Sequence, residues 1–502
     1  MKRNGKKAAI WGLLLLLGIS LLAGCNPGGP GNVSTGADGL PVDDESQPYE
    51  LDYWIAVEAA TIPKDLSLVE AAINEITQEK INATVTLHAV VVGDYESRMQ
   101  LTVNAGDKFD LCFTSPWLNK YSRLVELEGL YDITDLLPQY APHTWEMYDE
   151  KIWAAARIDG RIYGSINRQI MARTAGVSLD KAMYEASGMT EEDFATPDGM
   201  TRFLAYCADH GADMTNLTQG WDPQGLMALL QFNDLYGANT PGVIDVSSGE
   251  MTVFNQFESQ KFRDALAYSI DWYQKGYIHP DVLTTSFDFS KSYGIYMATW
   301  KPSGAGEDTV RRGGRESVCI PVGPSINYSN WVASTMTAVS ATSENPVRAV
   351  KFIELLNTDP QLYNLICYGI EGRHYTKLDD THIELIPDSG YSINAAWEFG
   401  DQFQSYLLPG YPEDVWEQTD RINQSAVFSP AVGFTFDPSP VRVEITNCQA
   451  VYTEFWYPLV SGVYGDQTYE RLDVFISRLK ESGSDKIIEE MQRQLDAWQA
   501  SQ

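Results

Sequence analysis

The sequence predicts an α/β protein made of two lobes, and three observations lead to this prediction. A chain of 502 residues is too long for one ordinary hydrophobic core. Its composition, 44% hydrophobic and 12% aromatic, is sufficient to fill more than one core. Residues 49–113 alternate strand-like and helix-like segments, and this order is typical of a parallel sheet covered by helices on both faces.

The segments of this alternation follow one another closely. β-Branched and aromatic residues mark the strands, and apolar residues at helical spacing mark the helices. We expect strands at 49–57, 83–92 and 107–113, and helices at 64–82 and 95–105, the second with Asp94 as its N-cap. Because ligands of parallel sheets bind at the carboxyl ends of the strands, Ser115 and Trp117 are expected beside a ligand.

Three later elements are also predicted from residue spacing. We expect a helix at 197–210, a strand at 317–322 and a C-terminal helix at 485–498. The apolar residues of the last helix recur on one side of it, so this helix is expected to pack on a lobe.

The first 25 residues carry the features of a bacterial lipoprotein signal. Their start is positively charged, residues 8–22 form an apolar run too short for a stable membrane span, and residues 22–25 (Leu-Ala-Gly-Cys) resemble a lipobox. The resemblance implies a signal peptide at 1–24, cleavage before Cys25 and acylation of its thiol, with palmitate as the expected chain. We therefore expect a protein held by lipid on the extracytoplasmic face of the cell membrane. The alternative is an ordinary signal peptide with an incidental cysteine.

Residues 25–48 are predicted to form a flexible tether. After Cys25 the stretch is rich in Gly, Pro, Ser and Asp and has almost no large apolar side chain. Such a segment cannot bury a core of its own.

The charge and the cysteines narrow the class of protein. The formal net charge is −32, which argues against nucleic acid as a partner because phosphate binding needs clustered Lys and Arg. Apart from Cys25, the cysteines are scattered and odd in number, so they are not a disulfide framework. They are expected to be free buried thiols, with one Cys112–Cys319 bridge as the alternative.

Sequence motifs for catalysis are absent. The chain has no G-x-S-x-G, no H-E-x-x-H, no Gly-rich loop ending in Gly-Lys-Ser/Thr and no G-x-G-x-x-G after a strand. Its six histidines lack the spacing of metal ligands. We therefore expect no catalytic residue, no metal and no cofactor. Paired carboxylates that cleave glycosides are left open, because they are defined by their separation in space.

Four stretches resemble the family 1 extracellular solute-binding proteins. They are GDYESRMQLTVNAGDKFDLCFTSPW at 93–117, residues 257–283, residues 344–375, and the C-terminal DKIIEEMQRQLDAW, which is similar to an extension found in a lipoprotein subgroup. The resemblance implies an α/β, type II periplasmic-binding-protein-like fold, in which two lobes are joined by a hinge and enclose a ligand cleft.

The same resemblance implies that each lobe is assembled from discontinuous segments. We expect the first lobe at 49–165 plus 288–340, and the second at 166–287 plus 341–502, including the C-terminal helices. The crossings between lobes are then expected near 160–166, 287–296 and 339–343.

Aromatic residues in loop-like contexts suit a sugar ligand. A pyranose ring packs its C–H face on an aromatic ring, while its hydroxyls need polar side chains in the ring plane. The aromatic candidates are Trp117, Trp221, Tyr296, Trp300, Trp331, Tyr375 and Trp397. The polar candidates are Asp110, Asp222, Glu371, Arg373, Asp401 and Gln402, in addition to Ser115 at the end of its strand. Each aromatic residue also suits core packing, and Glu371 and Arg373 equally suit a pair with each other.

The function implied is the solute-binding component of an ABC importer. Such a protein captures a small solute by hinge closure and delivers it to the transmembrane subunits of the permease. The aromatic residues make an oligosaccharide the expected solute. A cell-surface glycoside hydrolase, a peptide-binding importer receptor, and a surface sensor or adhesin remain as alternatives.

Overall fold

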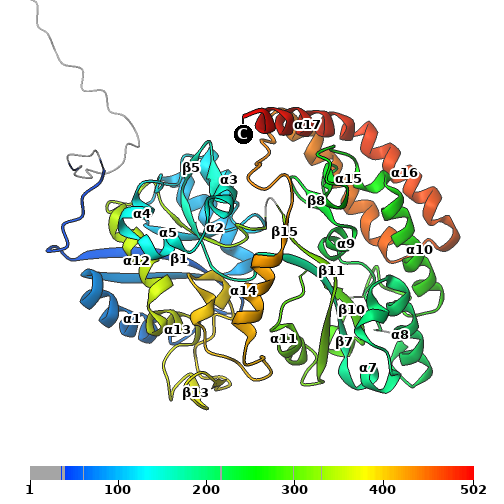
Figure 1. Ribbon diagram of the computed structural model, residues 1–502, viewed down its shortest axis with the longest axis horizontal. Helices are drawn as coiled ribbons and strands as arrows, with labels where there is room; N and C mark the ends of the chain where they lie inside the picture. The colour runs from blue at the N-terminus through cyan, green and yellow to red at the C-terminus, as the bar shows by residue number, and fades with distance from the viewer. Residues whose placement is uncertain are drawn as a thin grey trace, which may run out of the picture.

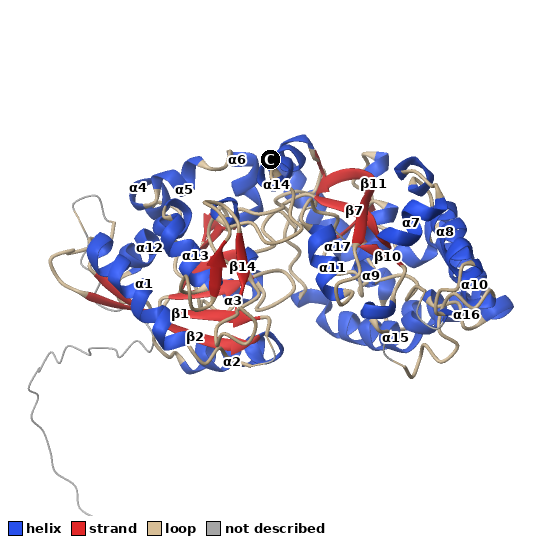
Figure 2. Cartoon of the chain, turned by 90° about the horizontal axis from the view of Figure 1, so that it is seen from below, coloured by secondary structure: helices blue, strands red, loops and turns tan. Residues whose placement is uncertain are grey.

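The computed structural model describes residues 36, 40–59, 61–214, 217–285, 287–297, 299–328 and 331–501. Two α/β lobes lie side by side, with helix α14 (Val415–Ser425) between them (Figures 1 and 2). The predicted two-lobe α/β class is therefore confirmed. The predicted signal peptide and Cys25 lie outside the described residues.

Lobe 1 is built on a five-stranded sheet in the order β2-β1-β3-β12-β6. Its strands are β1 (Tyr49–Val57), β2 (Ala83–Val91), β3 (Leu111–Thr114), β6 (Gly164–Ile166) and β12 (Met336–Val339). As predicted, β1 runs parallel to β2 and β3. β12 instead runs antiparallel to both of its neighbours, β3 and β6. The carboxyl end of β1 points toward lobe 2 (Figure 1), and β3 runs parallel to β1.

Helices pack around this sheet. They are α1 (Leu66–Ile81), α2 (Val92–Ala105), α3 (Tyr121–Glu126), α4 (Leu136–Tyr140), α5 (Pro142–Glu146), α6 (Glu150–Trp153), α12 (Pro346–Thr358) and α13 (Pro360–Tyr368). α1 and α2 match the predicted helices. The N-cap of α2 is Val91 and not Asp94, because the helix starts earlier than expected. Asp94 lies in its first turn, where a negative charge still favours the helix dipole.

Lobe 2 is built on a four-stranded sheet in the order β10-β7-β11-β15. Its strands are β7 (Arg173–Asp180), β10 (Gly294–Met297), β11 (Ser317–Asn327) and β15 (Val427–Phe428). β7 is antiparallel to both β10 and β11. All eight residues of β7 are buried, as expected for a strand that is paired on both edges.

The helices of lobe 2 include a C-terminal group. They are α7 (Lys181–Ser187), α8 (Pro197–Asp209), α9 (Pro223–Leu230), α10 (Gln260–Gln274), α11 (Gly304–Arg311), α15 (Arg442–Val460), α16 (Thr468–Glu481) and α17 (Ser484–Ser501). α8 and α17 match predicted helices. Ile487, Met491 and Leu495 of α17 are buried in the core of lobe 2, which confirms that the C-terminal helix packs on a lobe.

Three short hairpins complete the fold. They are β4–β5 (Arg157–Ile158 and Arg161–Ile162), β8–β9 (Phe232–Asp234 and Val243–Asp245) and β13–β14 (Tyr375–Lys377 and Ile383–Leu385). The β13 hairpin extends from the lower edge of lobe 1 in Figure 1.

Among the described residues, three segments cross between the lobes, at 167–172, at 328 together with 331–335, and at 409–426. The first follows β6 and lies close to the expected crossing at 160–166. The second joins β11 to β12, and the third contains α14 and leads to β15. The crossings expected at 287–296 and 339–343 do not exist, because β10 pairs with β7 inside lobe 2 and both β12 and α12 belong to lobe 1.

The expected lobe boundaries are corrected accordingly. Residues 288–327 belong to lobe 2, because β10 and β11 pair with β7. Residues 341–408 belong to lobe 1, because α12 and α13 pack on α1 and contribute to the lobe 1 core. Both differences come from long-range pairing, which local residue patterns do not reveal.

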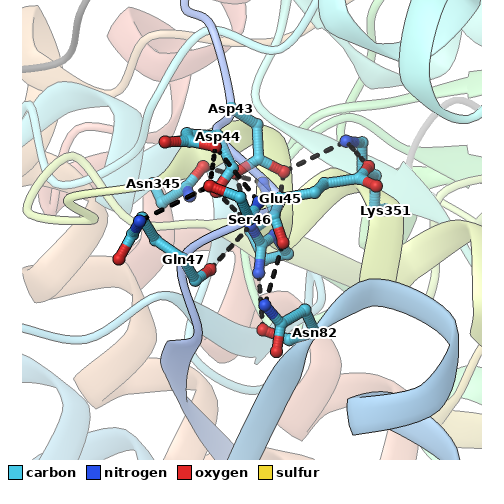
Figure 3. A network of polar contacts seen from close by, with 9 residues as sticks. Asp43, Asp44, Glu45, Ser46, Gln47, Asn82, Asn345 and Lys351 are labelled. Atoms are coloured by element: carbon cyan, nitrogen blue, oxygen red, sulfur yellow. Dashed lines mark hydrogen bonds and ion pairs between the residues drawn. The ribbon is translucent and has the colours of Figure 1, made fainter.

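The last part of the predicted tether is folded onto lobe 1. Asp43 accepts hydrogen bonds from Arg348 Nε at 2.8 Å and Nη2 at 2.7 Å, and from Asn345 Nδ2 at 2.8 Å. The side chains of Asp43 and Arg348 are 1% and 0% exposed. Figure 3 shows Asp43 facing Asn345 and Lys351, and the Lys351 Nζ lies 3.0 Å from Asp43 Oδ2.

Arg348 also binds the end of α1. Its Nη1 donates to the carbonyl oxygen of Asn82 at 2.7 Å, and Asn82 has the left-handed conformation that ends the helix. One buried cation thus joins the N-terminal segment, α1 and α12. Residues 40–48 are therefore part of lobe 1, and the prediction of a flexible tether concerns only residues before Leu40.

The five cysteines beyond Cys25 are free. Cys112 lies in β3 of lobe 1 and Cys319 in β11 of lobe 2, so the alternative of a bridge between them is wrong. Within the part of the chain that the structure describes, we find no helix with both the length and the apolar character needed to cross a membrane.

Candidate functional site

An aromatic wall stands at the carboxyl end of the lobe 1 sheet. It consists of Phe113, Trp117 and Trp397. The ring centroids of Trp117 and Trp397 are 5.5 Å apart, and both rings contact Phe113 at 6.0 and 5.7 Å. Trp117 is 42% exposed although it is large and apolar. Two of the predicted aromatic candidates are thus brought together on a surface that a sugar ring could cover.

The turn after β3 positions Trp117. Ser115 Oγ accepts the Leu118 N–H at 2.7 Å and donates to the Leu118 carbonyl oxygen at 2.8 Å. Ser115 is fully buried. It therefore shapes the turn that carries Trp117, and its hydroxyl is not presented to a ligand.

Buried hydrogen bonds hold the backbone on both sides of Trp397. The Tyr363 hydroxyl donates to the Ala396 carbonyl at 2.6 Å, and Asn167 Nδ2 donates to the Glu398 carbonyl at 2.5 Å. Glu398 is fully buried, and its Oε1 accepts the Ala56 N–H at 2.8 Å. Burial raises the pKa of the Glu398 carboxyl well above its usual value, and the Ala56 hydrogen bond opposes this only in part.

A hollow of about 640 Å³ lies between lobe 2 and α14. We call it the hinge hollow; its lining residues are Trp300, Gln418, Arg421, Ile422, Gln424 and Ser425. An indole, two amides, a guanidinium and a hydroxyl are the groups that pack on a sugar ring and hydrogen-bond to its hydroxyls. Its size is typical of small-molecule sites.

Trp300 is fixed on the lobe 2 sheet. Its backbone N–H donates to the Thr174 carbonyl at 2.6 Å, and its Nε1 donates to the Cys319 carbonyl at 3.0 Å. A Cβ added at Gly176 would lie 2.8 Å from the Trp300 Cβ, so only glycine lets the indole seat this closely on β7. The ring is thereby preorganised, which reduces the entropy lost when a ligand binds.

α14 is attached to lobe 1 on its other side. Arg168 lies 3.4 Å from Asp401 and 3.1 Å from Asp420, and the rings of Phe403 and Trp416 stack at 5.6 Å. Burial raises the pKa of Asp401, and the nearby Arg168 charge opposes this.

Asp401 and Gln402 therefore belong to the attachment of α14. The Asp401 carboxylate also accepts the Phe403 N–H at 2.9 Å, and the Gln402 N–H donates to the Arg168 carbonyl at 2.9 Å. These two predicted site residues shape the hinge, and they are absent from the lining of the hinge hollow.

The end of β1 faces the loop that carries Trp300. Burial raises the pKa of the Glu58 carboxyl. The positive charge of Lys301 lowers this pKa, and the negative charge of Glu307 raises it further. Lys301 and Glu307 form an ion pair with each other. Because Glu58 follows β1 and Lys301 follows Trp300, the carboxyl edge of the lobe 1 sheet and the Trp300 loop share one interlobe face.

On lobe 2, Trp331 packs on a buried cation. The guanidinium of Arg173 lies 4.3 Å from the Trp331 ring and 5.9 Å from the Tyr328 ring, and it donates to Gln224 at the start of α9. Arg173 is 3% exposed, and burial lowers its pKa. One face of Trp331 is therefore occupied by Arg173, at the point where two crossings enter lobe 2.

Three of the predicted site residues belong to the structure of lobe 2. Trp221 and Tyr296 are 3% and 2% exposed, and their rings contact each other at 4.7 Å in the core. The Asp222 carboxylate caps α9 by accepting the Gly225 N–H at 2.8 Å. The expectation that these residues face a ligand is corrected, because aromatic packing and helix capping account for them.

Three further candidates lie around the β13 hairpin of lobe 1. Glu371 pairs with Lys377 and Arg373 pairs with Asp65, so the two do not pair with each other. The buried Tyr375 packs on Tyr406, with ring centroids 5.8 Å apart. Their contacts stabilise the hairpin, and they take no part in the hollow or the wall.

The polar residues of α14 were missed by the sequence analysis. Gln418, Arg421 and Gln424 lie on one face of a helix whose opposite face is buried at Val415, Thr419 and Asn423. Helical spacing in 415–425 would have revealed the helix, but not that its polar face meets Trp300. Among the described residues, no group of three or more His, Cys, Asp or Glu side chains could hold a metal ion.

Comparison with known proteins agrees with this architecture. Residues 430–500, which contain the C-terminal helices, match the domain of unknown function DUF3502. A carbohydrate ABC transporter substrate-binding protein from Streptococcus pneumoniae serotype 4 is 23% identical over 505 residues, and the match covers 98% of each chain.

The fold is also similar to that of a solved structure, the N-glycan transport solute binding protein NgtS from Streptococcus pneumoniae. It has a TM-score of 0.78 and 20% identity, and the match covers 90% of this chain and 99% of that one. For the same protein in complex with Man5GlcNAc the TM-score is 0.69, with 20% identity, and the match covers 91% and 99% of the two chains. Along nearly all of its length, the chain is therefore similar in sequence and in fold to solute-binding proteins of ABC transporters.

Proposed function

We propose that this protein captures an oligosaccharide between its lobes and delivers it to the transmembrane subunits of an ABC importer. The observation that carries the proposal is the hinge hollow. There a preorganised indole, Trp300, faces the amides and the guanidinium of α14. The aromatic wall adds a second surface of the kind that packs on sugar rings.

The related proteins support the same solute class. The full-length relative is named for carbohydrate, and the solved neighbour is described in complex with Man5GlcNAc and with Man1GlcNAc. Since such relatives are solute-binding proteins, binding without turnover is the activity that we assign to this chain.

Hinge closure is the proposed mechanism. Trp300 belongs to lobe 2, α14 is attached to lobe 1 through Arg168, and the aromatic wall belongs to lobe 1. A ligand that contacts all three makes its full set of contacts only when the lobes approach, so binding shifts the equilibrium toward the closed state.

Attachment to the membrane is part of the proposal. The lipobox-like residues 22–25 support acylation of Cys25 and a place on the extracytoplasmic face of the cell membrane. Cys25→Ser should move the protein from the membrane fraction to the soluble fraction and abolish incorporation of labelled palmitate. Unchanged fractionation and labelling would contradict the anchor.

A thermal-shift screen tests the solute class. The protein is heated with a panel of oligosaccharides, peptides and amino acids, because a ligand that binds only the native state must raise the melting temperature. A saturable shift with an oligosaccharide that is recovered unchanged supports the proposal. Cleavage of the sugar would contradict the proposal and identify the protein as a glycoside hydrolase. Shifts with peptides alone would contradict an oligosaccharide as the solute and favour a peptide-binding receptor. Small-angle scattering with the bound ligand should show a smaller radius of gyration, as closure requires.

A further inference from the structure

Asn423 binds the backbone of the first crossing. Its Oδ1 accepts the Met171 N–H at 2.8 Å and the Ala172 N–H at 3.2 Å, and its Nδ2 donates to the Gln169 carbonyl at 2.7 Å. Asn423 is 5% exposed. Residues 169–172 lie in no helix or strand, so this one amide supplies hydrogen bonds that regular structure would otherwise provide.

Gln169 extends the connection to the second crossing. Its Nε2 donates to Thr335 Oγ1 at 2.8 Å and to Ser334 Oγ at 3.3 Å. Gln169 is 8% exposed. Asn423 belongs to the third crossing, so two buried amides join all three segments that connect the lobes.

The residues that flank Asn423 line the hinge hollow. Ile422 and Gln424 are its neighbours in the chain, and Gln418, Arg421 and Ser425 complete the α14 side of the hollow. α14 therefore presents one face to the hollow and one to the crossings. A displacement of the helix by a ligand must move the Asn423 amide against residues 169–172.

We propose that Asn423 is a positioning residue of the hinge, which makes the three crossings move as one unit and couples their position to ligand contacts in the hinge hollow. The coupling to a ligand rests on the proposed function. The connection between the crossings does not, because it is present in the structure without a ligand.

Asn364 is a matched control. It is 3% exposed, its Nδ2 donates to the carbonyls of Pro360 and Gln404 at 2.7 and 2.8 Å, and its Oδ1 accepts the Tyr406 N–H at 2.9 Å. Like Asn423, it is a helical asparagine with three hydrogen bonds to backbone groups. It makes no hydrogen bond to any of the three crossings, so Asn364→Ala removes the same kind of contacts without detaching one crossing from another.

Amide hydrogen exchange tests the connection in the full chain without a ligand. In the wild type, the Met171 and Ala172 amides should be protected although they lie outside helices and strands. In Asn423→Ala their exchange should be roughly tenfold faster, as expected for loss of a neutral buried hydrogen bond. Asn364→Ala should leave these two amides as slow as in the wild type.

The distance between the lobes provides a second readout. Spin labels at L101C and V443C report it, because Leu101 on α2 and Val443 on α15 are 66% and 70% exposed. C319A removes the partly exposed native thiol. Asn423→Ala should broaden the distance distribution, whereas Asn364→Ala should not.

Two further variants keep the test decisive if Asn423→Ala does not fold. Asn423→Asp retains the oxygen that accepts the Met171 and Ala172 N–H groups, so these amides should keep most of their protection from exchange. Gln169→Met should broaden the interlobe distance distribution, because it detaches the second crossing from the first. Fast exchange at Met171 and Ala172 in the wild type would overturn the proposal, as would equal effects of the Asn423 and Asn364 variants.

The ligand arm uses Man5GlcNAc as the probe. A narrowed interlobe distance in the wild type that is lost in Asn423→Ala, with binding retained, supports the coupling. If Man5GlcNAc narrows the distance equally in both, the coupling is wrong. Failure of every sugar in the thermal-shift screen would count against the proposed function, whereas the ligand-free measurements would still decide the role of Asn423.

Discussion

Trp117 and Trp397 come from distant parts of the chain, and their ring centroids lie 5.5 Å apart at the carboxyl end of the lobe 1 sheet. Trp117 follows β3, whereas Trp397 is carried by a short helical turn that packs on the end of β1. Such a pair of aromatic rings, one of them 42% exposed, is a surface suited to packing against a sugar ring.

Trp117→Ala should lower oligosaccharide affinity roughly tenfold, because an aromatic contact of this kind contributes on the order of 1 kcal/mol. Isothermal titration with the best ligand of the thermal-shift panel measures it. Tyr457→Ala is the control, since Tyr457 is 64% exposed on α15. If both variants bind as tightly as the wild type, the wall does not contact the ligand.

Gly176→Ala should displace Trp300. Its new Cβ would meet the Trp300 Cβ at 2.8 Å and the Ile320 carbonyl oxygen at 3.0 Å, so the unfolding free energy should fall by about 1–3 kcal/mol. Ligand affinity should fall with it, because the indole no longer seats on β7. The comparison is Gly93→Ala in α2, where nothing lies within 4 Å and a gain of about 0.5 kcal/mol is expected. Urea unfolding and titration calorimetry check both, and unchanged affinity in Gly176→Ala would rule out Trp300 as a contact.

Asp43→Asn should lower the unfolding free energy by about 3 kcal/mol, because it leaves the buried Arg348 without its counter-charge. Glu45→Gln is the matched control. Glu45 also pairs with Lys351 but is 54% exposed, so its loss should cost less than about 0.5 kcal/mol. Equal urea midpoints for the two variants would mean that the N-terminal segment adds little to lobe 1.

The same ion pair gives a pH dependence. Burial alone would raise the pKa of Asp43, but hydrogen bonds from Arg348, Asn345 and Lys351 outweigh it and lower the pKa to about 2. A lowered carboxyl pKa stabilises the fold above the unfolded-state pKa of about 4 and loses that contribution as the pH falls toward about 2. Asp43→Asn should remove this part of the acid destabilisation, which unfolding curves between pH 5 and pH 2 would show.

Glu398 should contribute a pH dependence of stability opposite to that of Asp43. Because its pKa is raised by burial, the folded protein holds this proton more tightly than the unfolded chain does. Stability is then lost as the pH rises above about 4.5, by up to about 1.4 kcal/mol per pH unit until the folded-state pKa is reached. Glu398→Gln should therefore stabilise the protein at pH 7 and have little effect at pH 4. Glu75→Gln, on the exposed side of α1, should change neither value, and an identical pH profile for wild type and Glu398→Gln would contradict the assignment.

Local residue patterns predicted many of the helices and strands, but they did not predict which lobe each later element joins. The first strands and helices of lobe 1 and the C-terminal helix were readable because their own spacing defines them. The lobe to which β10, β11 and α12 belong could not be predicted, because a partner far away in sequence decides it. The partner of the two strands is β7, and α12 packs on α1 and the lobe 1 core. A strand such as Gly294–Met297 has the same residue pattern whether it crosses between lobes or pairs within one.

The site was predicted in part for the same reason. Trp117, Trp300 and Trp397 were predicted because large aromatic residues in loop-like contexts suit a sugar ligand, and the structure places them at the aromatic wall and the hinge hollow. Trp221 and Tyr296 carry the same local signal, but each has its ring buried by Trp272 in the lobe 2 core. The docking of Asp43 on Arg348 had no local signal, since a single Asp in a Gly- and Pro-rich stretch resembles any solvated carboxylate.

The position of β12 makes the folding of lobe 1 wait for much of the chain. β12 lies between β3 and β6, so Met336 must pair with Thr114 and Ile166 after all of the intervening lobe 2 strands have been made. Sheets that depend on such distant pairing form slowly, because the entropy of closing a long loop is lost before the contacts form. A newly made chain therefore cannot complete the lobe 1 sheet until about two thirds of its residues have been synthesised.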